Sequence, residues 1–225
     1  MKDLNLRAID YPSISSTIAE QIRGNIVDGT LRPSQPLSES EIAKQLGVSR
    51  GPVREALQRL VQEGLLVRIP NRGVFVADIT QEDVAEIYEA RQVLEARCGA
   101  KVLAAGNGVL DRTVRELQEI VDKIGPAERS GRWREVVELD LRFHSCLVAA
   151  SGNSRIQRAY STLIVESSLS INRLERWYPA EDSLHREHQA IVDALAARDE
   201  AAFDQALAFH YLQTLTEKAE QSLRS

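Results

Sequence analysis

The sequence has few of the features that mark secreted or membrane proteins. Its two cysteines, Cys98 and Cys146, do not have the spacing of a disulfide framework or a thiolate zinc site. No run of 18 apolar residues occurs, and the N-terminus lacks the basic-then-apolar pattern of a signal peptide. We therefore expect a protein of the reducing cytoplasm with no membrane segment.

Aromatic residues and chain-breaking residues are also scarce. Aromatics make up 5% of the chain, and its 225 residues include 12 glycines and 7 prolines, which cluster at apparent boundaries. Helix-forming residues dominate, which predicts a mainly α fold. A chain of this length can bury two modest cores, so we expect two domains.

The charge is unevenly distributed. The whole chain has a net charge of −5, but residues 1–77 carry ten Lys and Arg against eight Asp and Glu, and the remainder has a net charge of −7. Residues 49–76 alone hold five arginines and two glutamates. The sequence therefore predicts a local cationic surface near the N-terminus, as in nucleic-acid-binding domains, followed by an acidic domain.

Residues 46–57 have the pattern of a turn followed by a short cationic helix. Gly47 suits the left-handed turn that ends a helix, and Ser49 is a favoured N-cap. Arg50 and Arg54 lie one helical turn apart, on a different face from the apolar residues. Such a helix fits the major groove of DNA. The apolar stripe is formed by Val53, Leu57, Leu60 and Val61.

The flanking segments favour a winged helix-turn-helix. Residues 37–46 predict a short helix capped by Ser38, and residues 65–69 and 74–76 predict two strands joined by residues 70–73. The alternative is a small α+β unit whose arginines are only solvated.

The segment Ser-Arg-Gly-Pro-Val-Arg-Glu-Ala-Leu, residues 49–57, resembles the recognition helix of the GntR family of bacterial transcription regulators, and Asn71-Arg72-Gly73 resembles its wing. This resemblance implies a set of DNA-contacting residues, in which the wing reaches the minor groove or the backbone. The chain departs from the family at Ser40, where an arginine often contacts DNA, so base preference there is open. The implied residues are Ser49, Arg50, Gly51 and Arg54 in the helix and Asn71 and Arg72 in the wing.

The rest of the chain predicts a bundle of about six antiparallel helices. Thr80 is a suitable N-cap for the first of them, with Asp83 at the third helical position. Helical periodicity then continues almost to the end of the chain. Breaks are expected at 106–108, 125–126, 151–153, 178–179 and 198–199.

Polar residues interrupt the apolar stripes of three of these helices. Asp140 and His144 lie one turn apart on one helix, and His188 and His210 lie eleven residues before and after Asp199. If the chain turns at Asp199, the latter two imidazoles lie side by side. Buried groups of this kind need a common partner, and one carboxylate with three imidazoles suits Zn²⁺, or else Ni²⁺ or Mn²⁺. A single histidine on an apolar face is more often an ordinary core residue.

Three segments resemble the metal-ligand motifs of the FCD effector domain, which defines the largest branch of the GntR family, the FadR subfamily. They are Asp-Leu-Arg-Phe-His at 140–144, Glu-His-Gln-Ala-Ile at 187–191, and His210. The resemblance thus covers nearly the whole chain and implies that Asp140, His144, His188 and His210 are the metal ligands. His185 matches no ligand motif, and we expect it at the surface or, at most, behind a ligand.

Arg91 lies within the apolar stripe of the first helix of this domain. It could form an ion pair with Glu95 one turn later, or its guanidinium group could bind the carboxylate of a ligand. The segment Arg91 to Glu95 resembles the family's Arg-x-x-Leu-Glu motif, which favours the second interpretation. Asn172 is a weaker effector-binding candidate, because a polar residue in such a mixed sequence is more often exposed.

The resulting hypothesis is a DNA-binding regulator rather than an enzyme. Residues 1–78 would form the winged helix-turn-helix domain, and residues 79–225 an all-α effector and dimerisation domain. The resemblance implies a homodimeric repressor that binds an inverted-repeat operator and is released by a small carboxylic acid at the metal site. Two alternatives stay open: a regulator with a purely structural metal that answers to metal or to a partner protein, and a metal-dependent hydrolase, for which no general base is evident.

Overall fold

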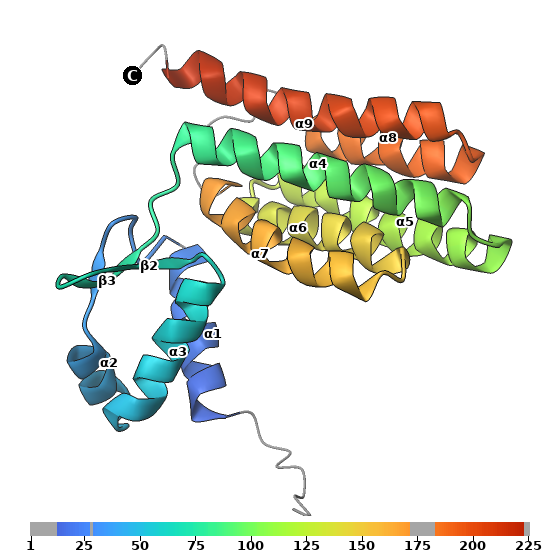
Figure 1. Cartoon of the computed structure of the whole chain (residues 1–225). Helices are drawn as coiled ribbons and strands as arrows, with labels where there is room; N and C mark the ends of the chain where they lie inside the picture. Colours follow the sequence, from blue (N-terminus) through green and yellow to red (C-terminus); the bar gives the residue numbers. More distant parts are fainter. Residues whose placement is uncertain (1–12, 28, 172–182, 223–225) are drawn as a thin grey trace, which may run out of the picture. The chain divides into compact units, whose positions relative to one another are not determined.

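The computed structural model describes residues 13–27, 29–171 and 183–222, and the chain divides into two compact units between Ala77 and Asp78. Each unit is mainly helical (Figure 1). Within these residue ranges, no helix has both the length and the apolar character needed to cross a membrane.

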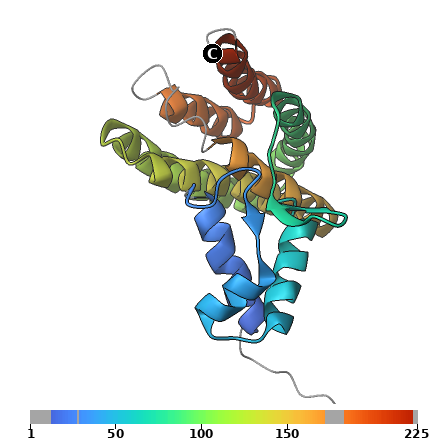
Figure 2. The ribbon, with the colours of Figure 1, turned by 90° about the vertical axis from the view of Figure 1, so that its left-hand side faces the viewer.

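The first unit is a winged helix-turn-helix, as predicted. α1 and α2 pack against α3, and a small antiparallel sheet of strand order β1-β3-β2 follows (Figure 2). The register pairs Leu66 with Val76 and Leu37 with Val74. The short strand β1 was not predicted. The elements are α1 (Ile14–Val27), β1 (Pro36–Leu37), α2 (Glu39–Leu46), α3 (Arg50–Gln62), β2 (Leu66–Ile69) and β3 (Gly73–Val76).

Local sequence explains the position of α3. Ser38 caps α2 by accepting a hydrogen bond from the Glu41 backbone N–H at 3.3 Å, and Gly47 ends α2 with a φ of 65°, which glycine adopts without strain. Ser49 occupies the N-cap position of α3, but its hydroxyl makes no capping hydrogen bond. Burial of Val53, Ala56, Leu57 and Leu60 anchors one face of α3 in the core.

The second unit is the predicted all-α bundle. Its elements are α4 (Gln81–Leu103), α5 (Asn107–Arg129), α6 (Trp133–Ala150), α7 (Ser154–Ile171), α8 (Ser183–Ala197) and α9 (Glu200–Ser222). α6 packs against α4, α5 and α7, α8 packs against α5 and α9, and α4 contacts α7 and α9 (Figure 1). α6 therefore carries its side chains into the middle of the bundle.

Two predicted boundaries are confirmed. Thr80 and Asp83 form a capping box in which each side chain accepts a hydrogen bond from the other residue's backbone N–H. The turn between α8 and α9 lies at Arg198, with a φ of 58°, and Asp199 accepts a hydrogen bond from the Ala202 N–H at 2.9 Å. This turn makes α8 and α9 a helical hairpin.

The break predicted at Gly125-Pro126 is wrong, because α5 continues through Pro126 to Arg129. Packing outweighs the cost of the missing proline N–H, since Ile124 and Ala127 on either side are fully buried. The glycine allows a close approach, as a Cβ at that position would lie 3.3 Å from the imidazole of His185. The break predicted at Tyr178-Pro179 lies outside the described residues.

Candidate functional site

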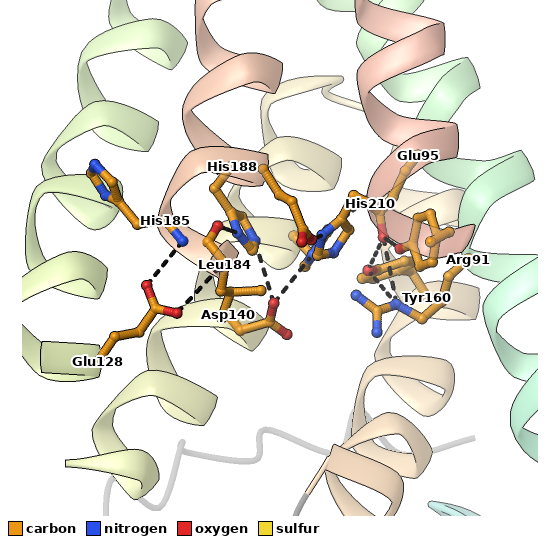
Figure 3. A network of polar contacts seen from close by, with 12 residues as sticks. Arg91, Glu95, Glu128, Asp140, Tyr160, Leu184, His185, His188 and His210 are labelled. Carbon is orange, nitrogen blue, oxygen red and sulfur yellow. Dashed lines mark hydrogen bonds and ion pairs between the residues drawn. The ribbon is translucent and has the colours of Figure 1, made fainter. Parts of the chain in front are cut away.

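The structure brings the four predicted metal-binding side chains together in the bundle. Asp140 and His144 come from α6, His188 from α8 and His210 from α9, and all four are buried. One potential ligand atom from each residue lies within 4.8 Å of those of the other three. Figure 3 shows Asp140, His188 and His210 pointing toward one another.

The distances between ligand atoms fit a small coordination sphere. His144 Nε2 lies 3.1 Å from His210 Nε2 and 3.6 Å from Asp140 Oδ1, and His188 Nε2 lies 3.3 Å from the same oxygen. Zinc–ligand bonds of about 2.0–2.1 Å in a tetrahedron place neighbouring donors about 3.3 Å apart. The spacing therefore fits a single transition-metal ion.

Each imidazole has an acceptor beside Nδ1. His144 Nδ1 lies 2.6 Å from Glu95 Oε2, His210 Nδ1 lies 2.8 Å from Glu187 Oε2, and His188 Nδ1 lies 2.9 Å from the Leu184 carbonyl. With the proton on Nδ1, each Nε2 presents a lone pair to the centre of the cluster, as metal-binding histidines do.

The Nε2 lone pairs of the cluster face few hydrogen-bond donors among the described residues. His188 Nε2 is fully buried and lies within ion-pair distance of Asp140, but it makes no hydrogen bond of acceptable geometry with any described residue. Two facing imidazole lone pairs 3.1 Å apart repel each other unless a proton or a cation lies between them. The residues present thus fit a bound cation.

The electrostatics favour an ionised Asp140 carboxylate and a neutral His210 imidazole. Burial opposes ionisation of Asp140, but His144 and His188 outweigh it and hold its pKa well below the usual range. Burial, together with the charges of His188 and His144, holds the pKa of His210 well below that of free histidine. His144 differs, because Glu95 outweighs its burial and raises its pKa. A proton on His144 is therefore the natural occupant when no metal is bound.

Glu187 behaves differently from the other carboxylates. Its burial, with a smaller contribution from the charge of Asp140, raises its pKa to about 7. It can therefore change charge near neutral pH while it contacts His210.

Arg91 lies on α4 close to the histidine cluster and is 1% exposed. Its Nε donates to the Tyr160 hydroxyl at 3.1 Å and lies 3.5 Å from Glu95 Oε1. The guanidinium also lies over the rings of Tyr88, Tyr160 and Tyr211, 5.4 to 5.8 Å from their centroids. Nη2 is buried and has no hydrogen-bond partner among the described residues. A buried donor in this state is a natural partner for a ligand oxygen.

Glu95 connects the arginine to the histidines. The hydroxyls of Tyr160 on α7 and Tyr211 on α9 both donate to its Oε1, and its Oε2 faces His144. Figure 3 shows Glu95 beside Tyr160 and Arg91. Burial opposes its ionisation, but His144, Arg91 and the Tyr160 hydrogen bond lower its pKa to about 2. One ionised carboxylate thus contacts groups from four helices.

Sequence reasoning missed the role of Glu95 beside His144, as well as Glu187, Tyr160 and Tyr211. A weak signal existed for the glutamates, because Glu95 follows Arg91 by one turn and Glu187 precedes His188 directly.

His185 does not join the cluster. His185 is half-buried, and its Nδ1 lies 3.2 Å from the Val121 carbonyl on α5. Asn172 lies outside the described residues, so its predicted role is untested.

All six predicted DNA-contacting residues are exposed. On α3, Arg50 makes no ion pair within the described ranges, whereas Arg54 is paired with Glu39 of α2. In the wing, Asn71 has a φ of 62° and the Arg72 guanidinium lies 5.6 Å from the centre of the Phe75 ring. The six are Ser49, Arg50, Gly51 and Arg54 in and before α3, and Asn71 and Arg72 between β2 and β3.

Known families match both units. Residues 14–76 match the family described as bacterial regulatory proteins, gntR family, and residues 86–213 match the FCD domain.

Similar proteins cover most of the chain. A probable D-xylose utilization operon transcriptional repressor of Paenarthrobacter nicotinovorans is 32% identical over 87% of this chain and 86% of its own length. The gluconate operon transcriptional repressor of Bacillus subtilis is 28% identical over 84% and 79%. A crystal structure of a GntR transcriptional regulator from Rhodococcus sp. RHA1 has a TM-score of 0.78 and 30% identity over 92% of this chain and 97% of that chain. The chain therefore belongs to the GntR family of DNA-binding transcription regulators and carries an FCD domain after its DNA-binding domain.

Proposed function

We propose that this regulator is a metal-dependent repressor whose DNA binding is weakened by a small carboxylic acid. The observation that carries the proposal is the convergence of three Nε2 atoms and one carboxylate, with each Nδ1 already facing an acceptor. Such an arrangement is costly without a cation.

The metal ligands in this proposal are Asp140, His144, His188 and His210. Three neutral imidazoles and one carboxylate suit Zn²⁺ best, and Ni²⁺ or Mn²⁺ are compatible with the same donors. When bound, the ion would supply positive charge and open coordination positions for a ligand oxygen.

Arg91 is the proposed second contact for the effector. Its Nη2, which has no hydrogen-bond partner among the described residues, would donate to a carboxylate, and the three tyrosines around it would limit the size of the ligand. The relative from B. subtilis is named for a gluconate operon, and gluconate is a small carboxylic acid of the proposed kind. Asn172 is proposed as a weaker contact.

In the N-terminal domain, we assign DNA contact to the exposed cationic face of α3 and to the wing. Arg50 and Arg54 would reach bases or phosphates of the major groove, with Ser49 and Gly51 near the backbone, and Asn71 and Arg72 would contact the adjacent minor groove or backbone. A homodimer would place two such helices on an inverted-repeat operator in the bacterial cytoplasm.

The sequence connection between the domains offers a route for the signal. We assign residues 1–78 to DNA binding and 79–225 to effector binding and dimerisation. α4 begins directly after this boundary and carries both Arg91 and Glu95. A ligand that shifts α4 would therefore alter the attachment of the wing, and the acid and the operator would change each other's affinity by the same factor.

The test is DNA release by acids in the presence and absence of metal. An operator duplex, selected from random DNA with the metal-loaded protein, is titrated by fluorescence anisotropy with small monocarboxylic and dicarboxylic acids, gluconate included. We expect one class of acid to weaken binding by at least about fivefold, within the usual range of allosteric coupling, and to lose its effect after chelation. Binding that responds to chelation alone would favour a regulator with a structural metal, and turnover of an acid would favour an enzyme.

A further inference from the structure

A carboxylate from the helix before the turn engages an arginine of the recognition helix. Glu39, the first residue of α2, has its Oε2 3.0 Å from Arg54 Nη2 and 3.1 Å from Arg54 Nε, and Oε1 lies 3.4 Å from Nε. The contact links two helices that are separated by the turn at Gly47 and Ser49.

The geometry of this pair leaves half of the arginine fork available. Glu39 occupies the edge formed by Nε and Nη2, while the guanidinium presents a second pair of donors at the edge formed by Nη1 and Nη2. A bidentate contact with guanine needs one such pair of donors. The arginine side chain remains 64% exposed, so that edge is accessible.

Arg50, one turn earlier on the same exposed face, provides the contrast. It has no ion-pair partner within the described ranges. No carboxylate among the described residues therefore orients Arg50 or offsets its charge, as suits a phosphate contact, whereas Glu39 orients the Arg54 guanidinium and partly cancels its charge.

We propose that Glu39 is a positioning residue that fixes Arg54 as a reader of guanine rather than a phosphate clamp. The inference rests on the proposed contact between Arg54 and DNA. Holding the fork in advance removes rotamer entropy that binding would otherwise cost, and this favours the base that fits the fixed orientation. The carboxylate also repels phosphate, which weakens binding to DNA of the wrong sequence.

Glu39→Gln is the test, with Glu41→Gln as the matched control. Both changes remove one negative charge from α2, but the side chain of Glu41 is exposed and has no ion pair with Arg54. Neither change is expected to unfold the domain, because exposed ion pairs stabilise proteins little.

The measurement uses full-length, metal-loaded protein and duplexes selected from a random library, in which each guanine of the site is replaced in turn. We expect Glu39→Gln to lower discrimination at one guanine by about tenfold, toward the value for Arg54→Ala, since a bidentate contact has roughly that effect. The slope of log affinity against log salt should steepen by up to about 0.9, because a freed arginine can neutralise a phosphate. Glu41→Gln should keep the wild-type discrimination.

If Glu39→Gln and Glu41→Gln discriminate guanine equally well while Arg54→Ala loses this discrimination, the positioning role of Glu39 is overturned. The proposed contact between Arg54 and DNA would then stand. Unchanged discrimination in Arg54→Ala would overturn both.

Discussion

The buried carboxylate of Glu95 is the most consequential single group of the C-terminal unit, and Glu95→Gln measures its contribution. The substitution keeps the size of the side chain but leaves Arg91 without its nearest countercharge and His144 without a charged acceptor. A pKa of about 2 against an ordinary value of 4.5 corresponds to about 3 kcal/mol of stabilisation at neutral pH. Loss of one partner from a buried charged pair costs about 3–5 kcal/mol, so both arguments predict a loss of at least about 3 kcal/mol.

Urea denaturation of the chelated protein provides the assay. Both tryptophans, Trp133 and Trp177, follow Asp78 in the chain, so their fluorescence reports on the second unit. Glu89→Gln is the matched control, because Glu89 is exposed on the same helix, and it should change stability by less than about 0.5 kcal/mol.

The pH dependence adds an independent check. A depressed carboxyl pKa stabilises the fold above the unfolded value near 4.5, and this stabilisation is lost as the pH falls toward 2. Glu95→Gln should lack that part of the acid transition. A decrease in the free energy of unfolding of less than about 1 kcal/mol at neutral pH, or an unchanged acid transition in the variant, would refute the claim that Glu95 is ionised and stabilises Arg91 and His144.

Three further predictions concern packing, protons and the effector. Gly99→Ala would place a Cβ within the van der Waals radius of the Phe203 ring and should cost about 1–3 kcal/mol in a thermal melt. Gly108→Ala, whose added Cβ would meet no described atom within 4 Å, should cost less than about 1 kcal/mol. Metal affinity, measured by chelator competition, should fall as the pH drops through the raised pKa of His144, because a proton competes with the metal for Nε2. A metal affinity that does not change with pH would contradict this competition. In the metal-free protein, the proton on His144 stabilises the fold at low pH, and this stabilisation is lost as the pH rises through the raised pKa. Arg91→Ala should keep the metal content of wild type but lose the melting shift caused by acids, and a wild-type shift would refute the Arg91 contact.

The helical bundle and the convergence of the four ligand candidates could be predicted because they depend on periodicity. A polar residue within an apolar stripe marks an inward position, and a turn at Asp199 brings His188 and His210 together whatever the packing details. The winged fold was predictable for a similar reason, since Ser38, Gly47 and Ser49 mark helix ends through local backbone chemistry.

The rest depends on tertiary contacts that a single sequence does not reveal. Glu95 and Glu187 look like ordinary solvated glutamates until α6 and α9 cover them, and Tyr160 looks like any core aromatic until α7 meets α4. The break predicted at Pro126 was wrong because burial of its neighbours holds the helix together. The local preference of a residue such as proline ends a helix only where burial of the neighbouring side chains does not hold the helix together.

The most direct test of the central claim is the metal content of the purified protein and of two histidine variants on α8. We predict about one transition-metal ion per chain in wild type and in His185→Ala, and none in His188→Ala, with all three proteins folded by circular dichroism. Absence of metal in wild type, with none regained after incubation with Zn²⁺ or Ni²⁺, or retention of a full equivalent by His188→Ala, would contradict the proposed metal centre.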